Sequence, residues 1–156
     1  IQGTVLNNCD NQAKYTAVTG NKFDKRDTHW PDLILSEADA LKNQGFWEYE
    51  FKKHGTCCSD LFNEEKYFDL ALRLKDRFDL LTTFRNNGII PQSSYTAHKI
   101  VKSIRTVTQV IPNLSCTRTM ELLEIGICFN RDASHMIDCD RPKTCNTKGN
   151  KQIMFP

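Results

Sequence analysis

The 156-residue chain is predicted to be an α+β protein in which helices pack against an antiparallel sheet and disulfides staple the fold. Residues 64–86 carry apolar side chains at spacings of three and four, as one face of a helix does. Residues 123–129 alternate between apolar and other side chains, as a half-buried strand does. The seven cysteines show no C-x-x-C spacing, which favours disulfides over a zinc or redox site.

Helices are expected to come first along the chain. Residues 1–28 are polar and rich in turn-forming residues, and they are predicted to form a loop. Pro31 suits the first turn of a helix that runs to about Gln44. A second helix is expected from Phe46 to about Gly55, after the interruption at Gly45.

The clearest helical pattern covers residues 64–86. Ser94 can cap a further helix, whose apolar stripe includes Ile100, Ile104 and Val107. That helix is expected to end before Pro112, because proline disrupts a helix interior.

Strands are expected in the last third of the chain. The strand over 123–129 continues through a polar loop, 130–134, to Met136 and Ile137, which predicts a hairpin. Residues 139–156 are predicted to be irregular. No linker or repeat interrupts the sequence, so residues 1–156 are predicted to form a single domain.

Composition limits the environment and the partners of the protein. A net charge of +2 permits an anionic partner without requiring one, and no apolar run is long enough to cross a bilayer. The last four cysteines lie among loop-forming residues, which indicates an oxidising compartment and secretion. Asn113-Leu114-Ser115 is a possible glycosylation acceptor, in agreement with secretion.

The stretch from Phe46 to Cys58 contains the residue types that RNA cleavage requires. Glu50 and His54 are four positions apart and share one face of a helix, with Lys53 beside them. Histidine is suited to act as a general base near neutral pH, and a lysine can stabilise negative charge on a phosphate. These groups suit attack of a ribose 2′-OH on the adjacent phosphorus, a reaction that DNA cannot undergo. The alternative is an ordinary solvated helix face, since Glu and His at this spacing also stabilise helices slightly.

The wider string resembles a known active-site segment. Trp47, Glu50, Phe51 and the run Lys53-His54-Gly55-Thr56-Cys57 match the second active-site segment of the ribonuclease T2 family, roughly W-x-x-E-[WF]-x-K-H-G-T-C. The segments 30–33, 124–128 and 154–156 also resemble plant members, so the resemblance covers the whole chain.

The resemblance implies roles for these residues. His54 would be the general base, and Glu50 and Lys53 would stabilise the transition state. Phe46 and Trp47 would help to bind substrate, and the reaction would need neither metal nor cofactor. The products would be a 2′,3′-cyclic phosphate and a free 5′-OH.

The resemblance also implies three disulfides and leaves Cys58 without an assigned partner. The implied pairs are Cys9 with Cys57, Cys116 with Cys145, and Cys128 with Cys139. A disulfide at Cys57 would exclude the alternative of a cysteine nucleophile, because that chemistry needs a free thiolate.

The sequence departs from the family in its first active-site segment, H-G-L-W-P, which supplies a second catalytic histidine and is missing here. In plant relatives that segment lies just upstream of the stretch matching 1–9, so the chain is expected to be an N-terminally truncated fragment, nearly inactive alone. If the mature protein begins at Ile1, the enzyme interpretation fails. His29 precedes Trp30-Pro31 but belongs to a later segment; it is expected on the surface, as are His98 and His135.

Tyr49 replaces a histidine found in many family members and favours a style ribonuclease of self-incompatibility, of the nightshade type. Such an enzyme would be secreted into the style, enter pollen tubes as a monomer and degrade their RNA. Exposed loops near 10–27 and 34–43 would be read by pollen F-box-type proteins. The alternatives are a phosphate-scavenging or defence ribonuclease, and a catalytically inactive secreted relative.

Overall fold

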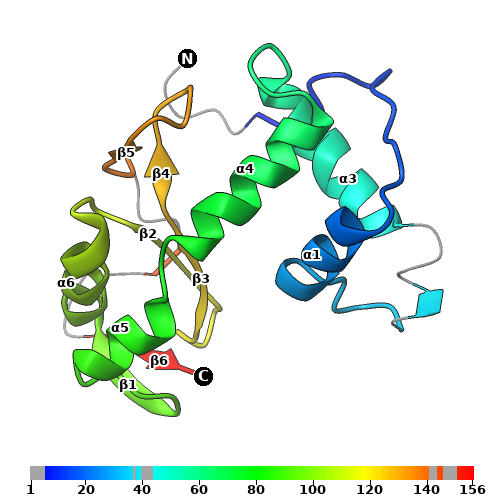
Figure 1. Cartoon of the computed structure of the whole chain (residues 1–156). Helices are drawn as coiled ribbons and strands as arrows, with labels where there is room; N and C mark the ends of the chain where they lie inside the picture. Colours follow the sequence, from blue (N-terminus) through cyan, green and yellow to red (C-terminus); the bar gives the residue numbers. More distant parts are fainter. Residues whose placement is uncertain (1–5, 37, 40–43, 141–143, 146–150) are drawn as a thin grey trace. The chain divides into compact units, whose positions relative to one another are not determined.

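The chain forms two compact units, Ile1–Arg77 and Phe78–Pro156, which are described separately (Figure 1). The single domain expected over residues 1–156 stays a prediction. The computed structural model describes residues 6–36, 38–39, 44–140, 144–145 and 151–156.

The regular structure of the first unit is helical. The elements with described bounds are α1 (Asn21–His29), α3 (Gly45–Lys53), the 3₁₀ turn η1 (Gly55–Cys58) and α4 (Glu64–Asp76). An aromatic core holds these elements, with Trp47, Phe51 and Phe68 buried at its centre. Phe68 is fully buried and contacts the rings of both Trp30 and Tyr67 edge-on. The helix expected from Phe46 is therefore confirmed.

Helix α1 corrects the prediction that residues 1–28 form only loop. Its Phe23 ring lies edge-on against Trp47, with 5.5 Å between ring centroids. Arg26 is only 3% exposed and lies over the Phe68 ring, 3.7 Å from its centroid. These contacts come from residues distant in the sequence, so a local pattern could not reveal them.

The helix predicted to begin at Pro31 is absent from residues 31–36. The Asp32 side chain accepts hydrogen bonds from the backbone N–H groups of Ile34 and Leu35, at 2.8 and 3.3 Å. Such a turn competes with helix formation. Residues 38 and 39 are helical, and residues 40–43 lie outside the described part of the chain.

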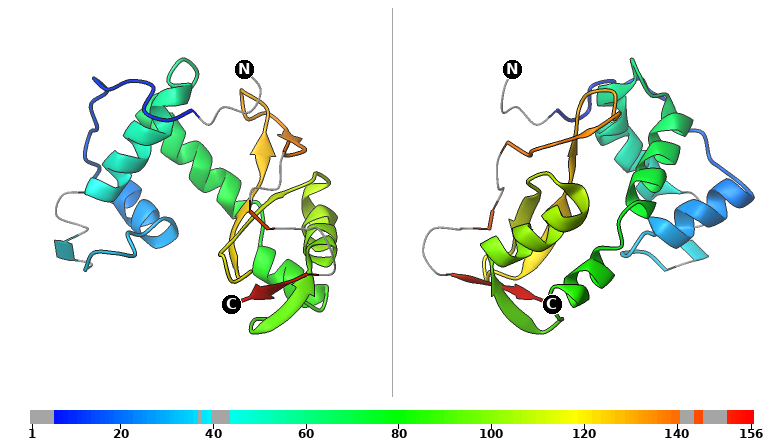
Figure 2. Two further views of the ribbon diagram at one scale, coloured as in Figure 1. Left: turned by 180° about the vertical axis from the view of Figure 1, so that it is seen from behind. Right: turned by 60° about the vertical axis from the view of Figure 1, so that its left-hand side comes forward.

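The second unit combines two helices with strand pairs (Figures 1 and 2). The pairs are β1 with β6, β2 with β3, and β4 with β5, all antiparallel. The helices are α5 (Leu80–Asn86) and α6 (Ala97–Thr108); the strands are β1 (Ser93–Thr96), β2 (Asn113–Cys116), β3 (Leu122–Gly126), β4 (Cys128–Phe129), β5 (Met136–Ile137) and β6 (Gln152–Phe155).

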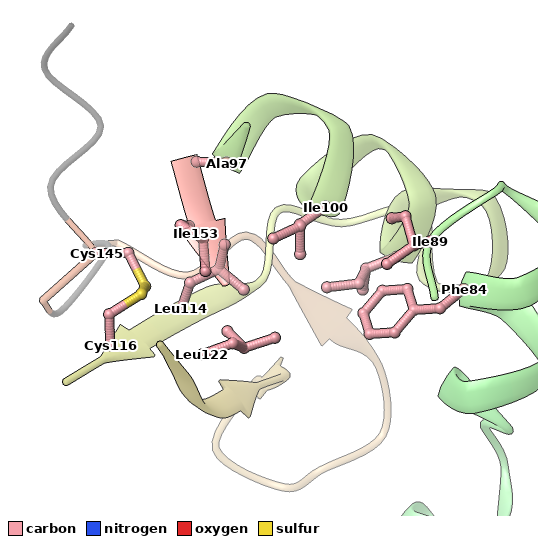
Figure 3. Packing of buried hydrophobic residues seen from close by; sticks show 10 residues of the cluster. Phe84, Ile89, Ala97, Ile100, Leu114, Cys116, Leu122, Cys145 and Ile153 are labelled. Carbon is pink, nitrogen blue, oxygen red and sulfur yellow. A yellow bond between two sulfur atoms is a disulfide. The ribbon is translucent and has the colours of Figure 1, made fainter. Parts of the chain in front are cut away.

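The core of this unit lies between α6 and the strands (Figure 3). Ile100 and Ile104 of α6 are fully buried, together with Ile153 of β6. Leu114 of β2, Leu122 of β3 and Phe84 of α5 belong to the same cluster. The α+β class, with helices packed on antiparallel strands, is confirmed. Val107, expected on the apolar stripe, is instead 42% exposed.

Three local predictions in this unit need correction. Thr96, not Ser94, caps α6, and its side chain accepts a hydrogen bond from the Lys99 N–H at 3.2 Å. Ser94 lies in β1, paired with Met154 of β6. The tail expected to be irregular therefore contains a strand. The hairpin expected between the strand over 123–129 and Met136–Ile137 is confirmed for Cys128–Phe129. The expected strand itself is divided into β3 and β4, and Leu123, expected on its apolar face, is 70% exposed.

Three disulfides connect the cysteine pairs that the sequence resemblance implies. Cys9–Cys57 lies in the first unit, and Cys116–Cys145 and Cys128–Cys139 lie in the second. Cys58 is a free thiol. Among the described residues, no helix is both long enough and apolar enough to cross a membrane.

Candidate active site

The candidate catalytic residues lie at the C-terminal end of α3. Glu50 and Lys53 belong to its last turn, and His54 is its C-cap. The His54 backbone N–H donates to the Glu50 carbonyl at 2.9 Å, which places these two residues one turn apart. All three side chains are partly exposed. The helical spacing inferred from the sequence is therefore present.

Lys53 places a positive charge in the last turn of α3. Its Nζ lies over the Tyr49 ring, 5.0 Å from the ring centroid. The Tyr49 side chain, and to a smaller extent the negative charge of Glu50, raises the pKa of Lys53. The ammonium is therefore held in its charged form beside the Glu50 carboxylate.

Glu50 also influences Tyr67, which the sequence pattern placed only on the apolar stripe of a helix. Burial raises the pKa of Tyr67 to about 12, and the negative charge of Glu50 adds to this effect. The Tyr67 ring packs on Phe51, with 6.1 Å between centroids. Tyr67 thus forms an apolar, neutral wall near Glu50, and sequence periodicity alone could not distinguish that role from ordinary core packing.

The imidazole of His54 and the carboxylate of Glu50 form no hydrogen bond or ion pair with any residue in the described ranges. The hydrogen bond that connects the two residues is the one between their backbones, from the His54 N–H to the Glu50 carbonyl. Both groups are consequently available to a ligand, and the sequence-based expectation that they act on one phosphate stays a prediction.

The Thr56 side chain connects the end of α3 to Cys9 by hydrogen bonds. Its hydroxyl donates to the Lys52 carbonyl at 2.7 Å and accepts from the Cys9 N–H at 3.2 Å. The Asn8 N–H donates to the Lys53 carbonyl at 2.8 Å. Together with the Cys9–Cys57 disulfide, these bonds hold the end of α3 in place.

Gly55 is required because the chain behind His54 is crowded. A Cβ at this position would overlap the Phe51 ring and would lie 3.2 Å from Cδ1 of Tyr67. The buried Gly55 therefore allows the 3₁₀ turn to begin directly after the histidine.

The two predicted substrate-binding aromatic residues have different surroundings. Trp47 is 4% exposed, and its indole N–H donates to the Trp30 carbonyl at 2.8 Å, so it anchors α3 in the core. Phe46 is partly buried against the same aromatic cluster. Their contact with substrate stays a prediction.

The other histidines lie outside the end of α3, whereas Cys57 and Cys58 follow it in η1. His98 and His135 are exposed, as expected, whereas His29 belongs to the last turn of α1 and faces Asp76.

Cys57 is in a disulfide, which excludes a thiolate nucleophile there. Burial raises the pKa of the Cys58 thiol, whose S–H donates to the Gly55 carbonyl at 3.2 Å. Within the described ranges, no three His, Cys, Asp or Glu side chains cluster in a way that could hold a metal ion.

Comparison with known proteins identifies the family. The model of the ribonuclease T2 family matches residues 2–139. The chain belongs to the ribonuclease T2 family. It is 49% identical over 154 residues to Ribonuclease S-6 of Nicotiana alata, which covers 98% of this chain and 72% of that protein. It is 30% identical over 160 residues to Ribonuclease 1 of Arabidopsis thaliana, covering 99% of this chain and 67% of that protein.

Solved T2 ribonucleases share the fold. The self-incompatibility-associated SF11-RNase of Nicotiana alata superposes with a TM-score of 0.90 at 39% identity, covering 98% of this chain and 79% of that one. RNase NT in complex with 5′-AMP gives a TM-score of 0.74 at 26% identity, covering 97% and 75% of the two chains. The family resemblance on which the residue roles depend is thus established, and the α+β class is that of these ribonucleases.

Proposed function

We propose that this protein is an endoribonuclease that cleaves single-stranded RNA, with His54 as its general base. The imidazole takes the proton of a ribose 2′-OH as that oxygen bonds to the adjacent phosphorus. The bond from phosphorus to the 5′-oxygen breaks, leaving a 2′,3′-cyclic phosphate and a 5′-OH. A second group must protonate the leaving oxygen, and none of the residues above is assigned to it.

One observation carries this proposal: a partly exposed imidazole at the end of α3 without a hydrogen-bonding partner in the described part of the chain, next to Lys53. A base already engaged with the protein would have to break that contact before it could accept a proton. The Lys53 ammonium supplies positive charge for the pentavalent phosphorus, and Glu50 lies close enough to interact with that ammonium.

Replacement of His54 tests the assignment. In the full-length protein expressed from its gene, His54→Ala is expected to lower kcat for the dinucleotide CpA by roughly 10²- to 10⁴-fold, the usual contribution of a positioned base. His98→Ala is the matched control, because His98 is exposed on α6 and should leave kcat unchanged within about twofold. Undiminished cleavage by the His54 variant would remove it from the mechanism. Absence of cleavage by the unmodified protein would favour an inactive secreted relative.

A more specific proposal is that the enzyme is a secreted style ribonuclease of gametophytic self-incompatibility. The identity of 49% to Ribonuclease S-6, against 30% to Ribonuclease 1 of Arabidopsis, supports it. Three disulfides suit an oxidising compartment. Transcripts confined to the style would agree with this role, whereas induction in phosphate-starved leaves would support the scavenging alternative.

Pollen F-box-type proteins would bind the surface near residues 10–27 and 34–43. Ile34 is 91% exposed, as such a surface requires, although Arg26 is buried and therefore cannot contact a partner directly. Residues 37 and 40–43 lie outside the described ranges. Glycosylation at Asn113, a partly buried position in β2, also stays a prediction.

A further inference from the structure

A cavity of about 510 Å³ in the first unit is lined mainly by cations. It is bordered by α1 and α4, which pack against each other. Its lining residues are Lys25 of α1, Phe62 before α4, and Lys66, Asp69 and Arg73 of α4. We call this cavity the α1–α4 groove. Three cations against one carboxylate give its walls a net charge of +2.

The groove cations lack the ion pairs that Lys22, Arg26 and His29 of α1 form. Neighbouring charges are matched across the helix pair: Lys22 with Glu65, Arg26 with Glu64 at 3.9 Å, and His29 with Asp76 at 3.8 Å. The side chains of Lys25, Lys66 and Arg73 form no ion pair or hydrogen bond with any residue that the structure describes. The groove cations therefore have no ion-paired carboxylate among the described residues, which suits them to an external anion.

Phe62 adds an aromatic surface to these charges. It is partly exposed and lies outside the buried aromatic core of the unit. Its backbone N–H donates to the Cys58 carbonyl at 2.9 Å, which ties this wall of the groove to η1, the turn that follows His54. A partly exposed ring beside unpaired cations is a combination on which single-stranded nucleic acids bind, with bases on the ring and phosphates on the cations.

We propose that the α1–α4 groove binds single-stranded RNA at nucleotides away from the bond that is cleaved. Lys25, Lys66 and Arg73 contact phosphates, and Phe62 stacks on a base. Lys66 and Arg73 are seven residues apart on one helix, roughly 10 Å along its axis, so they reach more than one phosphate. An acidic protein segment would use the cations but not the ring, and the ring therefore favours RNA. The inference rests on the proposed function for its choice of ligand.

A binding experiment that needs no catalysis tests the groove. The probe is a fluorescent 2′-O-methyl oligoribonucleotide of about 12 nucleotides, which cannot be cleaved, and the readout is fluorescence anisotropy at several salt concentrations. The triple variant Lys25→Gln, Lys66→Gln, Arg73→Gln is expected to bind roughly tenfold more weakly. Its slope of log affinity against log salt should fall by about two, since each single-strand phosphate contact contributes about 0.7.

A matched control separates the groove from net charge. The control is the triple variant Lys14→Gln, Arg118→Gln, Lys151→Gln. It also removes two lysines and one arginine, at exposed positions outside the groove. It should weaken binding by less than about twofold. Asp69→Asn should tighten binding, because it removes the one carboxylate from the groove wall. Phe62→Ala should weaken RNA binding while leaving binding of polyglutamate unchanged.

The outcomes distinguish this inference from the proposed function. Equal losses in the groove and control variants would overturn the inference, as would polyglutamate binding at least as tight as RNA with no effect of Phe62→Ala. In cleavage assays, the groove variant should raise KM for polymeric RNA and leave CpA turnover unchanged. If His54→Ala left CpA cleavage intact, the proposed function would fail while the anisotropy result still reported on the groove.

Discussion

The end of α3 favours positive charge, which is the charge that a histidine acquires when it acts as a base. The last carbonyl groups of a helix carry partial negative charge, typically worth 0.3–1 kcal/mol to a nearby cation. Lys52 and Lys53 already occupy the last turn, and His54 follows as the C-cap. The helix end therefore places two ammonium groups where the backbone stabilises positive charge, in the turn that directly precedes His54.

The residues after His54 serve the geometry of the turn more than the chemistry. Gly55 leaves room for the Phe51 ring, Thr56 bonds to both Lys52 and Cys9, and Cys57 carries a disulfide. The family motif thus combines reactive side chains with the residues that fix their position. The sequence motif does not distinguish the candidate catalytic residues from those that fix the turn. The side-chain contacts in the structure do.

Gly55→Ala should damage the site through packing alone. The new Cβ would overlap the Phe51 ring, and relief would require the buried core around Phe51 to shift. Overpacking of this kind typically costs about 1–3 kcal/mol, and CpA cleavage should fall with it. Gly126→Ala is the milder control, since its Cβ would approach Asn113 at 3.3 Å at the edge of β2. Urea denaturation measures both; equal stability of the two variants would contradict the expectation.

At the scale of elements, the pattern over residues 64–86 predicted one helix where the structure has two. The apolar spacing continues through the break, but Asp79 adopts a non-helical backbone conformation and its side chain accepts the Thr82 N–H at 2.9 Å. A new cap therefore starts α5 after α4 has ended. Hydrophobic periodicity gives the buried face of a segment, whereas capping decides where its helices begin and end.

Asn63→Ala should weaken the start of α4. The Asn63 side chain accepts the Lys66 N–H at 3.0 Å, satisfying one of the donors that a helix leaves free at its first turn. Loss of such a cap typically costs about 1 kcal/mol of the free energy of unfolding. Asn63→Asp should keep most of this stability, and Asn11→Ala, at an exposed turn position, should change little. A urea midpoint for Asn63→Ala equal to that of Asn11→Ala would count against the cap.

At the scale of the molecule, the elements that sequence reasoning missed are those formed by distant partners. Strand β6 exists because β1 pairs with it, with Tyr95 opposite Ile153, and α1 depends on contacts to α3 and α4. The β4–β5 hairpin joins neighbouring residues and was predicted. The helix end that carries Glu50, Lys53 and His54 was also predicted, because the pattern lies within a few consecutive residues.

The two units differ in how much buried apolar core they have, and this should appear in their dependence on disulfides. Among the described residues, Trp47, Phe51 and Phe68 form the buried cluster of the first unit, whereas ten residues form that of the second. A small core relies more on covalent links. Cys9–Cys57 spans 48 residues and Cys128–Cys139 spans 11, so chain entropy assigns the first a stabilisation of about 4 kcal/mol and the second about 3 kcal/mol.

The double variant Cys9→Ala/Cys57→Ala should therefore lower the thermal midpoint of the first unit more than Cys128→Ala/Cys139→Ala lowers that of the second. Both tryptophans, Trp30 and Trp47, belong to the first unit, so their fluorescence follows its unfolding directly, and far-UV circular dichroism follows the unfolding of both units. The comparison should be made under non-reducing conditions, with iodoacetamide blocking of the Cys58 thiol after folding to prevent exchange. An equal or smaller loss for the longer loop would mean that the aromatic cluster around Phe68 stabilises the first unit without its disulfide.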